Sequence, residues 1–168
     1  MHRALGLALL ALGACATAGP PPRLSSQVGK RLALVAPDLE GQAVDVGADQ
    51  GKVRIVDFWA TWCEPCKEEL PALDALHREL GSRGLAVYGI SFDEDPAQIP
   101  DFLAQLRVRF RVLWDRGGDQ FSGRFEVQRL PTTLVVDRQG VIRFVHEGWS
   151  ETRAAEQRRQ VERLLDEK

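Results

Sequence analysis

The stretch that decides the fold is residues 53–71, which read VRIVDFWATWCEPCKEELP. The first seven residues form an apolar run typical of a buried strand, and the residues that follow Cys63 place apolar side chains at helical spacing as far as Leu80. Cys63 and Cys66 therefore lie where a strand gives way to a helix. Backbone N–H groups and the helix dipole favour negative charge at such a junction, so a thiol there ionises more easily.

The spacing of the two cysteines suits thiol–disulfide exchange. A thiolate at Cys63 can attack a disulfide, and Cys66 can then attack the mixed disulfide that forms. A permanent structural disulfide across so short a loop would stabilise the fold very little. A zinc site would need two more ligands, and the chain beyond residue 14 offers only His77, His146 and Cys15, without the spacing of a zinc finger. We therefore favour a redox function for the pair.

Length and charge indicate one domain and give no sign of a nucleic-acid partner. The chain has 168 residues, and its 22 Lys and Arg residues nearly balance 24 Asp and Glu residues, with neither sign segregated. Its three cysteines are too few for the disulfide framework of a small secreted domain. One hydrophobic core of ordinary size is expected.

The N-terminus predicts export from the cytoplasm. A positive start at residues 1–3 precedes an apolar stretch over residues 4–14, which is too short to remain as a membrane-spanning helix. Residues 12–15 (LGAC) resemble a bacterial lipobox, which implies that residues 1–14 are a signal peptide and that Cys15 becomes lipidated. Two alternatives compete with lipidation: cleavage after residues 16–18 (ATA) would release a soluble protein, or Cys15 could be an incidental residue of the apolar stretch. The export signal places the domain outside the cytoplasm in either case.

The remaining sequence predicts a tether followed by an α/β domain. Residues 15–33 are rich in Ala, Gly, Pro and Ser, which is typical of a flexible tether, and residues 34–168 form the expected domain. A hairpin is predicted over residues 34–46, and a buried strand over 53–59. The other predicted strands are 85–92, 110–114, 132–136 and 141–145, and the predicted helices are 63–80, 96–106, 119–125 and 151–165.

In this order, the motifs resemble those of the thioredoxin superfamily. The resemblance rests on DFWATWCEPC at residues 57–66, on Glu69 and Pro71, on APD at 36–38 and on LPTT at 130–133. Within the superfamily the chain is similar to the TlpA/ResA-like branch of membrane-tethered, extracytoplasmic thiol–disulfide oxidoreductases. The resemblance implies a thioredoxin-like fold, with a central mixed sheet flanked by helices and an N-terminal β-hairpin extension.

The resemblance also implies roles for individual residues. Cys63 would be the exposed nucleophile and Cys66 the resolving thiol, and their disulfide would serve as the redox group without a further cofactor. Pro131 would follow a cis peptide bond beside the dithiol, and Leu130 would offer main-chain hydrogen bonds to a substrate. The other expected substrate contacts flank or separate the cysteines: Trp62, Glu64 and Pro65.

Asp57 and Glu69 are the candidates for proton transfer. Asp57 lies in an apolar strand, where burial would raise its pKa and allow it to take the proton of Cys66. At a strand end facing a loop it would instead be an ordinary polar residue, and TlpA-like relatives often have Asn at this position. Glu69 matches an acid that tunes thiol ionisation in ResA-like proteins, although the first turn of a helix favours acids in any case.

Other polar groups are interpreted as solvated. The acidic run Asp93-Glu94-Asp95 follows a predicted strand and is expected to form an exposed loop. His77 and His146 are expected at the surface rather than as ligands.

The resemblance implies a reductant of protein disulfides, with apocytochrome c as one candidate substrate. A membrane electron donor of the CcdA or DsbD type would then reduce the cysteine pair again, and a lipid anchor would hold the domain at the membrane. Two alternatives stay open. One is an oxidase that donates its disulfide to substrates, and the other is a non-enzymatic lipoprotein that acts as an adaptor or metal-delivery module.

Overall fold

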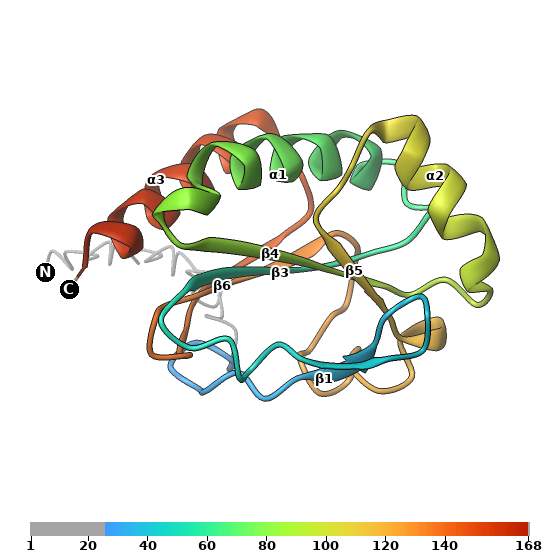
Figure 1. The fold of residues 1–168 in the computed structure, drawn as a ribbon, viewed down its shortest axis with the longest axis horizontal. Coiled ribbons are helices and arrows are strands. Elements are labelled where there is room, and N and C mark those ends of the chain that lie inside the picture. Colours follow the sequence, from blue (N-terminus) through green and yellow to red (C-terminus); the bar gives the residue numbers. More distant parts are fainter. Residues whose placement is uncertain (1–25, 168) are drawn as a thin grey trace, which may run out of the picture.

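The computed structural model describes residues 26–167, which build a five-stranded sheet with helices on one face and a β-hairpin with a series of turns on the other (Figure 1). The predicted signal peptide of residues 1–14 and the predicted lipidation of Cys15 lie outside the described residues. In the part of the chain that is described, no helix is long and apolar enough to cross a membrane.

The central sheet is mixed, as predicted, and its strands follow the order β5-β4-β3-β6-β7. Strands β3 (Val53–Trp59), β4 (Leu85–Ser91) and β5 (Arg111–Trp114) run parallel to one another. Strand β6 (Thr132–Val136) is antiparallel to β3, and β7 (Ile142–Glu147) is antiparallel to β6. The N-terminal hairpin pairs β1 (Val35–Pro37) with β2 (Ala43–Asp45).

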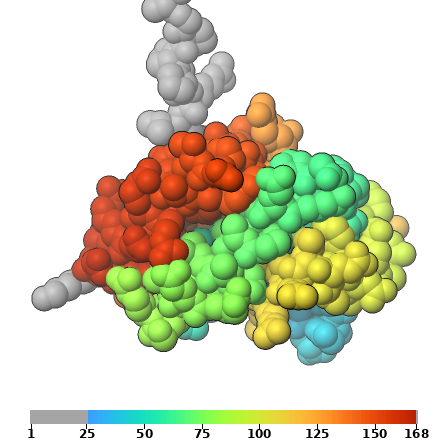
Figure 2. All heavy atoms as spheres, turned by 90° about the horizontal axis from the view of Figure 1, so that it is seen from above, coloured from blue at the N-terminus to red at the C-terminus, as the bar shows by residue number. Residues whose placement is uncertain are grey.

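Three α-helices lie side by side over one face of the sheet: α1 (Cys66–Leu80), α2 (Ile99–Leu106) and α3 (Glu151–Asp166) (Figures 1 and 2). Short 3₁₀ turns follow α1 (Gly81–Arg83), precede α2 (Pro96–Gln98) and follow β5 (Arg116–Gly118). The predicted start of the first helix at residue 63 is three residues too early, because residues 63–65 form a turn before the helix. The predicted helix over 119–125 is wrong. That segment forms turns after two glycines with positive φ, Gly117 and Gly118.

The packed part of the chain begins before residue 34. The Gly29 N–H donates to the Ile142 carbonyl oxygen at 2.8 Å, and the Leu32 N–H donates to the Gly140 carbonyl oxygen at 2.8 Å. Leu32 is also buried against the hairpin side of the sheet. Residues 29–32, which the composition assigned to the tether, therefore contact the β6–β7 hairpin.

Strand β3 occupies the middle of the sheet, and all seven of its residues are buried. Alternate side chains point to opposite faces of a strand. Val53, Ile55 and Trp59 pack in the cluster under the helices, whereas Val56 and Phe58 pack in the cluster on the hairpin side. By the same alternation Asp57 faces the helices and Arg54 faces the hairpin.

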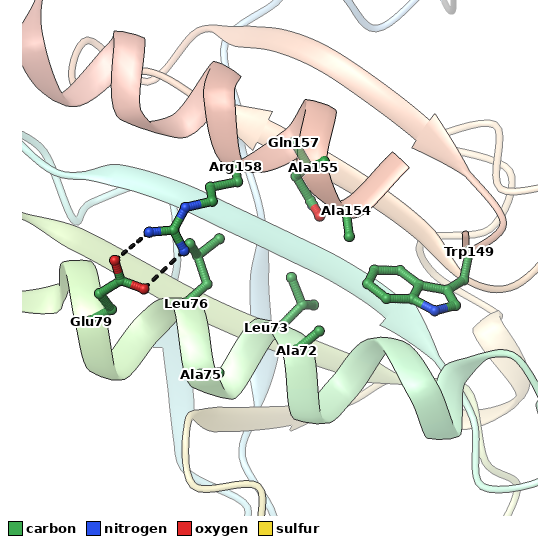
Figure 3. Close-up of a pocket in the computed structure, with 10 residues that line it drawn as sticks. All are labelled: Ala72, Leu73, Ala75, Leu76, Glu79, Trp149, Ala154, Ala155, Gln157 and Arg158. Atoms are coloured by element: carbon green, nitrogen blue, oxygen red, sulfur yellow. Dashed lines mark hydrogen bonds and ion pairs between the residues drawn. The ribbon is translucent and has the colours of Figure 1, made fainter. Parts of the chain in front are cut away.

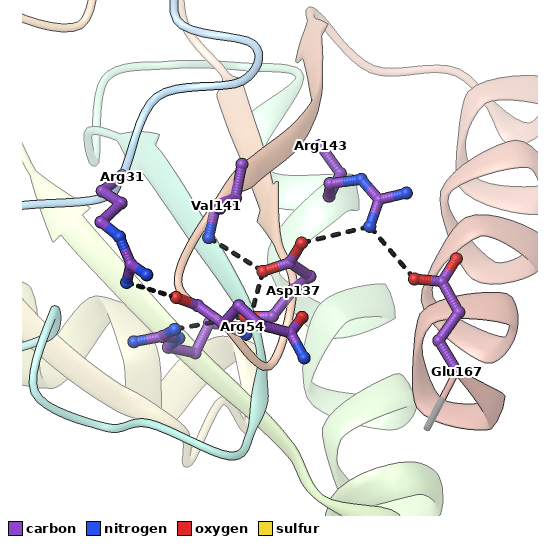
Figure 4. Close-up of polar contacts among 7 residues, drawn as sticks. Arg31, Arg54, Asp137, Val141, Arg143 and Glu167 are labelled. Carbon is purple, nitrogen blue, oxygen red and sulfur yellow. Dashed lines mark hydrogen bonds and ion pairs between the residues drawn. The ribbon is translucent and has the colours of Figure 1, made fainter.

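Arg54 connects separate segments of the chain at the end of the sheet that lies away from the cysteines. Its side chain is fully buried, and its guanidinium donates to the carbonyl oxygens of Val46, Gly47 and Asp137 at 2.9, 3.1 and 3.2 Å. Figure 4 shows the Asp137 carboxylate bonded to Arg143, which also reaches Glu167 after α3, each at 3.1 Å. This network joins the loop after β2, the β6–β7 turn and the C-terminal helix.

Candidate active site

The two cysteines lie in the loop that leads from β3 into α1, and they are joined by a disulfide. Their Cα atoms are 5.3 Å apart. Both pack in the cluster under the helices, so Cys63 is only 5% exposed and is less open than the expected exposed nucleophile. Cys66 is 0% exposed. Of the pair, only Cys63 therefore presents any surface to a partner.

Asp93 fixes the start of the cysteine loop. Its carboxylate accepts hydrogen bonds from the Thr61 N–H at 3.0 Å, from the Thr61 hydroxyl at 2.6 Å and from the Ser91 hydroxyl at 2.7 Å. Asp93 is fully buried, so its assignment to a solvated loop is wrong. Asp93 follows the C-terminal end of β4, which pairs with β3, and so faces the loop that leaves β3. Its hydrogen bonds fix Thr61, two positions before Cys63.

The loop before β6 packs against the core that contains the disulfide. The Leu130–Pro131 peptide bond is cis, and Leu130 is half-buried against the cluster that contains Cys63 and Cys66. The Pro131 carbonyl oxygen accepts a hydrogen bond from the Gly148 N–H at 2.7 Å. The cis peptide bond is present as the sequence motifs imply, and the loop borders the core cluster to which both cysteines belong.

The remaining expected substrate contacts lie at the surface around the disulfide. Trp62 is 68% exposed, which is unusual for so large an apolar side chain. Glu64 and Pro65 are exposed between the cysteines, and the Glu64 carboxylate pairs with the Lys67 ammonium at 2.6 Å. An exposed indole next to Cys63 offers a ring on which a bound polypeptide could pack.

Two buried acids lie under the helix that carries Cys66. Asp57 on β3 is 0% exposed, and Glu69 on α1 is 2% exposed. Glu69 is three residues after Cys66, so the two side chains share one face of the helix. Burial raises the pKa of Glu69 to about 7. Burial, together with the neighbouring Glu69, raises the pKa of Asp57 well above its usual value.

Thr133 is the site residue that sequence reasoning missed. Its hydroxyl lies 2.9 Å from Glu69 Oε1 and 3.3 Å from Asp57 Oδ1. Thr133 pairs directly with Asp57 across β3 and β6. The need of a buried acid for a hydrogen-bond donor was a usable signal, but the strand register that selects Thr133 over Thr132 could not be known from the motif alone.

An apolar groove of about 280 Å³ runs between α1 and α3, with Trp149 at one end (Figure 3). Its walls carry small side chains, and its other end is closed by the ion pair of Arg158 with Glu79. Since it contains no cysteine and its only carboxylate is paired, the groove adds no redox chemistry.

His146 is buried rather than exposed, contrary to the sequence interpretation. It lies on β7 directly across from Thr133, and its Nε2 is 2.7 Å from Gln160 Oε1. Burial lowers its pKa. Within residues 26–167, no group of three His, Cys, Asp or Glu side chains is placed to hold a metal ion.

Comparison with known proteins confirms the resemblance and the fold. Residues 28–145 match the model of the AhpC/TSA family. A thiol-disulfide oxidoreductase ResA of Bacillus cereus is 31% identical over 117 residues, covering 69% of this chain and 67% of that protein. The thioredoxin-like protein YneN of Bacillus subtilis is 31% identical over 140 residues, covering 79% and 81%. A Chlorobium tepidum structure assigned as the thiol:disulfide interchange protein DsbE has a TM-score of 0.76 at 26% identity, covering 82% of this chain and 97% of that one.

Replacing Glu69 by Gln should flatten the pH dependence of stability. In the folded protein Glu69 keeps its proton up to about pH 7, whereas its ordinary pKa is 4.5. The folded state therefore holds more protons in this range, and the free energy of unfolding falls as the pH rises from 4.5 to about 7. Removing the titrating group should reduce that fall by up to about 3 kcal/mol, measured by urea unfolding of the oxidised protein.

The matched control is Glu68→Gln, since Glu68 is the exposed neighbour of Glu69 on the same helix turn. This variant should retain the pH dependence of the wild type. An equal response of the two variants would contradict the raised pKa of the buried Glu69.

Proposed function

We propose that this chain, which belongs to the AhpC/TSA family and is a thiol–disulfide oxidoreductase of the ResA/DsbE type, reduces disulfides of protein substrates outside the cytoplasm. The observation that carries the proposal is the disulfide of Cys63 and Cys66, in which only Cys63 has any exposed surface. Two buried acids lie on β3 and α1, the elements that flank the disulfide, and Leu130 packs against the core cluster that contains both cysteines.

In the proposed reaction, the reduced protein begins with a thiolate at Cys63. This thiolate attacks a substrate disulfide and forms a mixed disulfide, while the second substrate sulfur leaves with the electron pair. Cys66 then attacks the Cys63 sulfur and releases the other substrate thiol. Glu69 accepts the Cys66 proton, because a carboxyl with a pKa of about 7 is half ionised at neutral pH.

Asp57 is less suited to accept a proton than its strand position first indicated. Burial and the neighbouring Glu69 raise its pKa well above the usual value, which favours the form that already carries a proton. We therefore assign Asp57 the role of a neutral neighbour that supports Glu69, rather than that of the first acceptor.

The exposed Trp62, Glu64 and Pro65 form the surface that a substrate polypeptide would meet as it approaches Cys63. By the TlpA/ResA-like resemblance, Leu130 would offer main-chain hydrogen bonds to the same polypeptide, and Pro131 would follow it across the cis peptide bond. Apocytochrome c is one candidate substrate, and a membrane protein of the CcdA or DsbD type is the proposed donor that reduces the pair again. Both proposals rest on the TlpA/ResA-like resemblance.

Export and anchoring are proposed from residues 1–18 alone. The lipobox-like residues 12–15 support lipidation of Cys15 after removal of residues 1–14. A lipid anchor would keep the domain close to a membrane electron donor, where the reducing pool of the cytoplasm is absent.

The reduction potential distinguishes the proposed reductant from an oxidase. We expect a value near that of thioredoxin, about −270 mV, measured by equilibrating the pair with a thiol redox buffer. A value near that of DsbA, about −120 mV, would show that the protein donates its disulfide instead.

Replacing Cys66 by Ser should trap the substrate. Incubation of the reduced variant with oxidised apocytochrome c should accumulate a mixed disulfide through Cys63, visible on a non-reducing gel, because no resolving thiol remains. The Cys63→Ser variant is the control and should trap far less, since Cys66 is fully buried. Normal biological activity in the Cys63→Ser variant would favour the adaptor function.

Replacing Cys15 by Ser should prevent anchoring. The wild type expressed in a bacterium should incorporate labelled fatty acid and partition with membranes, and the variant should lose the label. A wild-type protein that is exported but carries no label would show that it is a soluble protein, cleaved near residues 16–18.

A further inference from the structure

One hydroxyl group lies between the two buried acids of the active site. Thr133 on β6 places its Oγ1 2.9 Å from Glu69 Oε1 on α1 and 3.3 Å from Asp57 Oδ1 on β3. All three residues are at most 2% exposed. The outer oxygens, Asp57 Oδ2 and Glu69 Oε2, have no hydrogen-bond partner among residues 26–167.

The number of hydrogens limits how these three groups can be charged. A hydroxyl carries one hydrogen and can donate it to only one carboxylate. Its second contact is a hydrogen bond only if the other carboxyl is protonated and donates to the hydroxyl oxygen. Two ionised carboxylates sharing one donor in a buried site would be strongly unfavourable. The geometry therefore fits a pair of acids that together hold one proton.

The surroundings decide which acid keeps this proton. The positive charge of Arg153 on α3 favours ionisation of Glu69. Asp57 has Gly89 of β4 on its other side, so no charged residue pairs with it there. Three other groups lie nearby. His146 on β7 forms a hydrogen bond with Gln160, and the negative charge of Glu156 on α3 favours the protonated form of His146. Cys66 lies on the same face of α1 as Glu69. Asp57 is thus the member that keeps its proton more strongly, and Glu69 is the member that ionises near neutral pH.

We propose that Thr133 is a positioning residue that joins Asp57 and Glu69 into one acid–base unit, which holds a single proton at rest and receives a second one from Cys66. This inference rests on the proposed function. When Cys66 resolves the mixed disulfide, its S–H bond breaks and the proton moves to Glu69. The Cys66 sulfur bonds to the Cys63 sulfur, and the bond from Cys63 to the substrate sulfur breaks. The substrate sulfur leaves with the electron pair and takes a proton from the acid–base unit, which then holds one proton again.

Removal of the Thr133 hydroxyl tests the unit itself. Infrared titration of the oxidised protein should show one protonated carboxyl at neutral pH in the wild type. In Thr133→Val the first ionisation should occur about one to two pH units higher, because the carboxylate loses its hydrogen-bond donor. Thr133→Ser keeps the hydroxyl and should titrate like the wild type. Two fully ionised carboxyls at neutral pH in the wild type, or identical titrations of the Val and Ser variants, would overturn the proposal.

A second variant keeps the test decisive if Thr133→Val does not fold. Asp57→Asn should remove the carboxyl that is protonated at neutral pH and leave a single ionisation from Glu69. Persistence of the protonated carboxyl band in Asp57→Asn above the Glu69 transition would overturn the assignment.

Rapid mixing of reduced protein with a disulfide-bonded protein substrate tests the link to Cys66. The pH profile of the resolution rate should move in Thr133→Val by the same amount as the infrared transition, and should stay unchanged in Thr133→Ser. An infrared shift without a shift in this profile would overturn the coupling to Cys66. If the wild type resolves no protein disulfide, the proposed function fails, while the infrared titration still reports on the unit.

Discussion

Strand β3 is buried on both faces, so its polar side chains are removed from water and depend on hydrogen-bond partners inside the protein. Its two ends meet this constraint differently. Arg54 donates to three backbone carbonyl oxygens and joins three segments of the fold. Asp57 shares a single hydroxyl with Glu69 and keeps one oxygen without a partner among the described residues. One end of the strand is thus fixed by the three hydrogen bonds of Arg54, and the other carries a carboxyl that shares its donor with a second acid.

The same strand positions the cysteines. It delivers the chain at its C-terminal end into the loop that Asp93 holds through Thr61, and α1 begins at Cys66. Because α1 packs over β3, the helix turn after Cys66 brings Glu69 down to the level of Asp57. The redox pair and the proton-exchanging pair are therefore placed by the same two elements, and a shift of α1 against the sheet would disturb both.

Much of this arrangement could be predicted from the sequence, because it depends on local patterns. The apolar run of residues 53–59, the cysteine spacing and the apolar runs at 132–136 and 141–145 each identify their element directly. Other features depend on contacts between distant segments. Asp93 sits in an acidic run that looks solvated, yet it is buried because the β3 loop supplies donors to it. The partner of Asp57 depends on the register of β6, which the motif does not specify.

A pair of acids does what a single buried acid cannot do here. Asp57 alone, with burial holding its pKa well above the usual value, would favour the form that already carries a proton and would be a poor acceptor for the proton of a thiol. Two ionised carboxylates would destabilise the core beneath the helices. Bridging the acids through Thr133 allows one to remain neutral while the other is ionised close to Cys66, and Arg153 favours the charge on Glu69. Because Asp57 keeps the proton and Glu69 carries the charge, Glu69 can serve as a buried base at neutral pH.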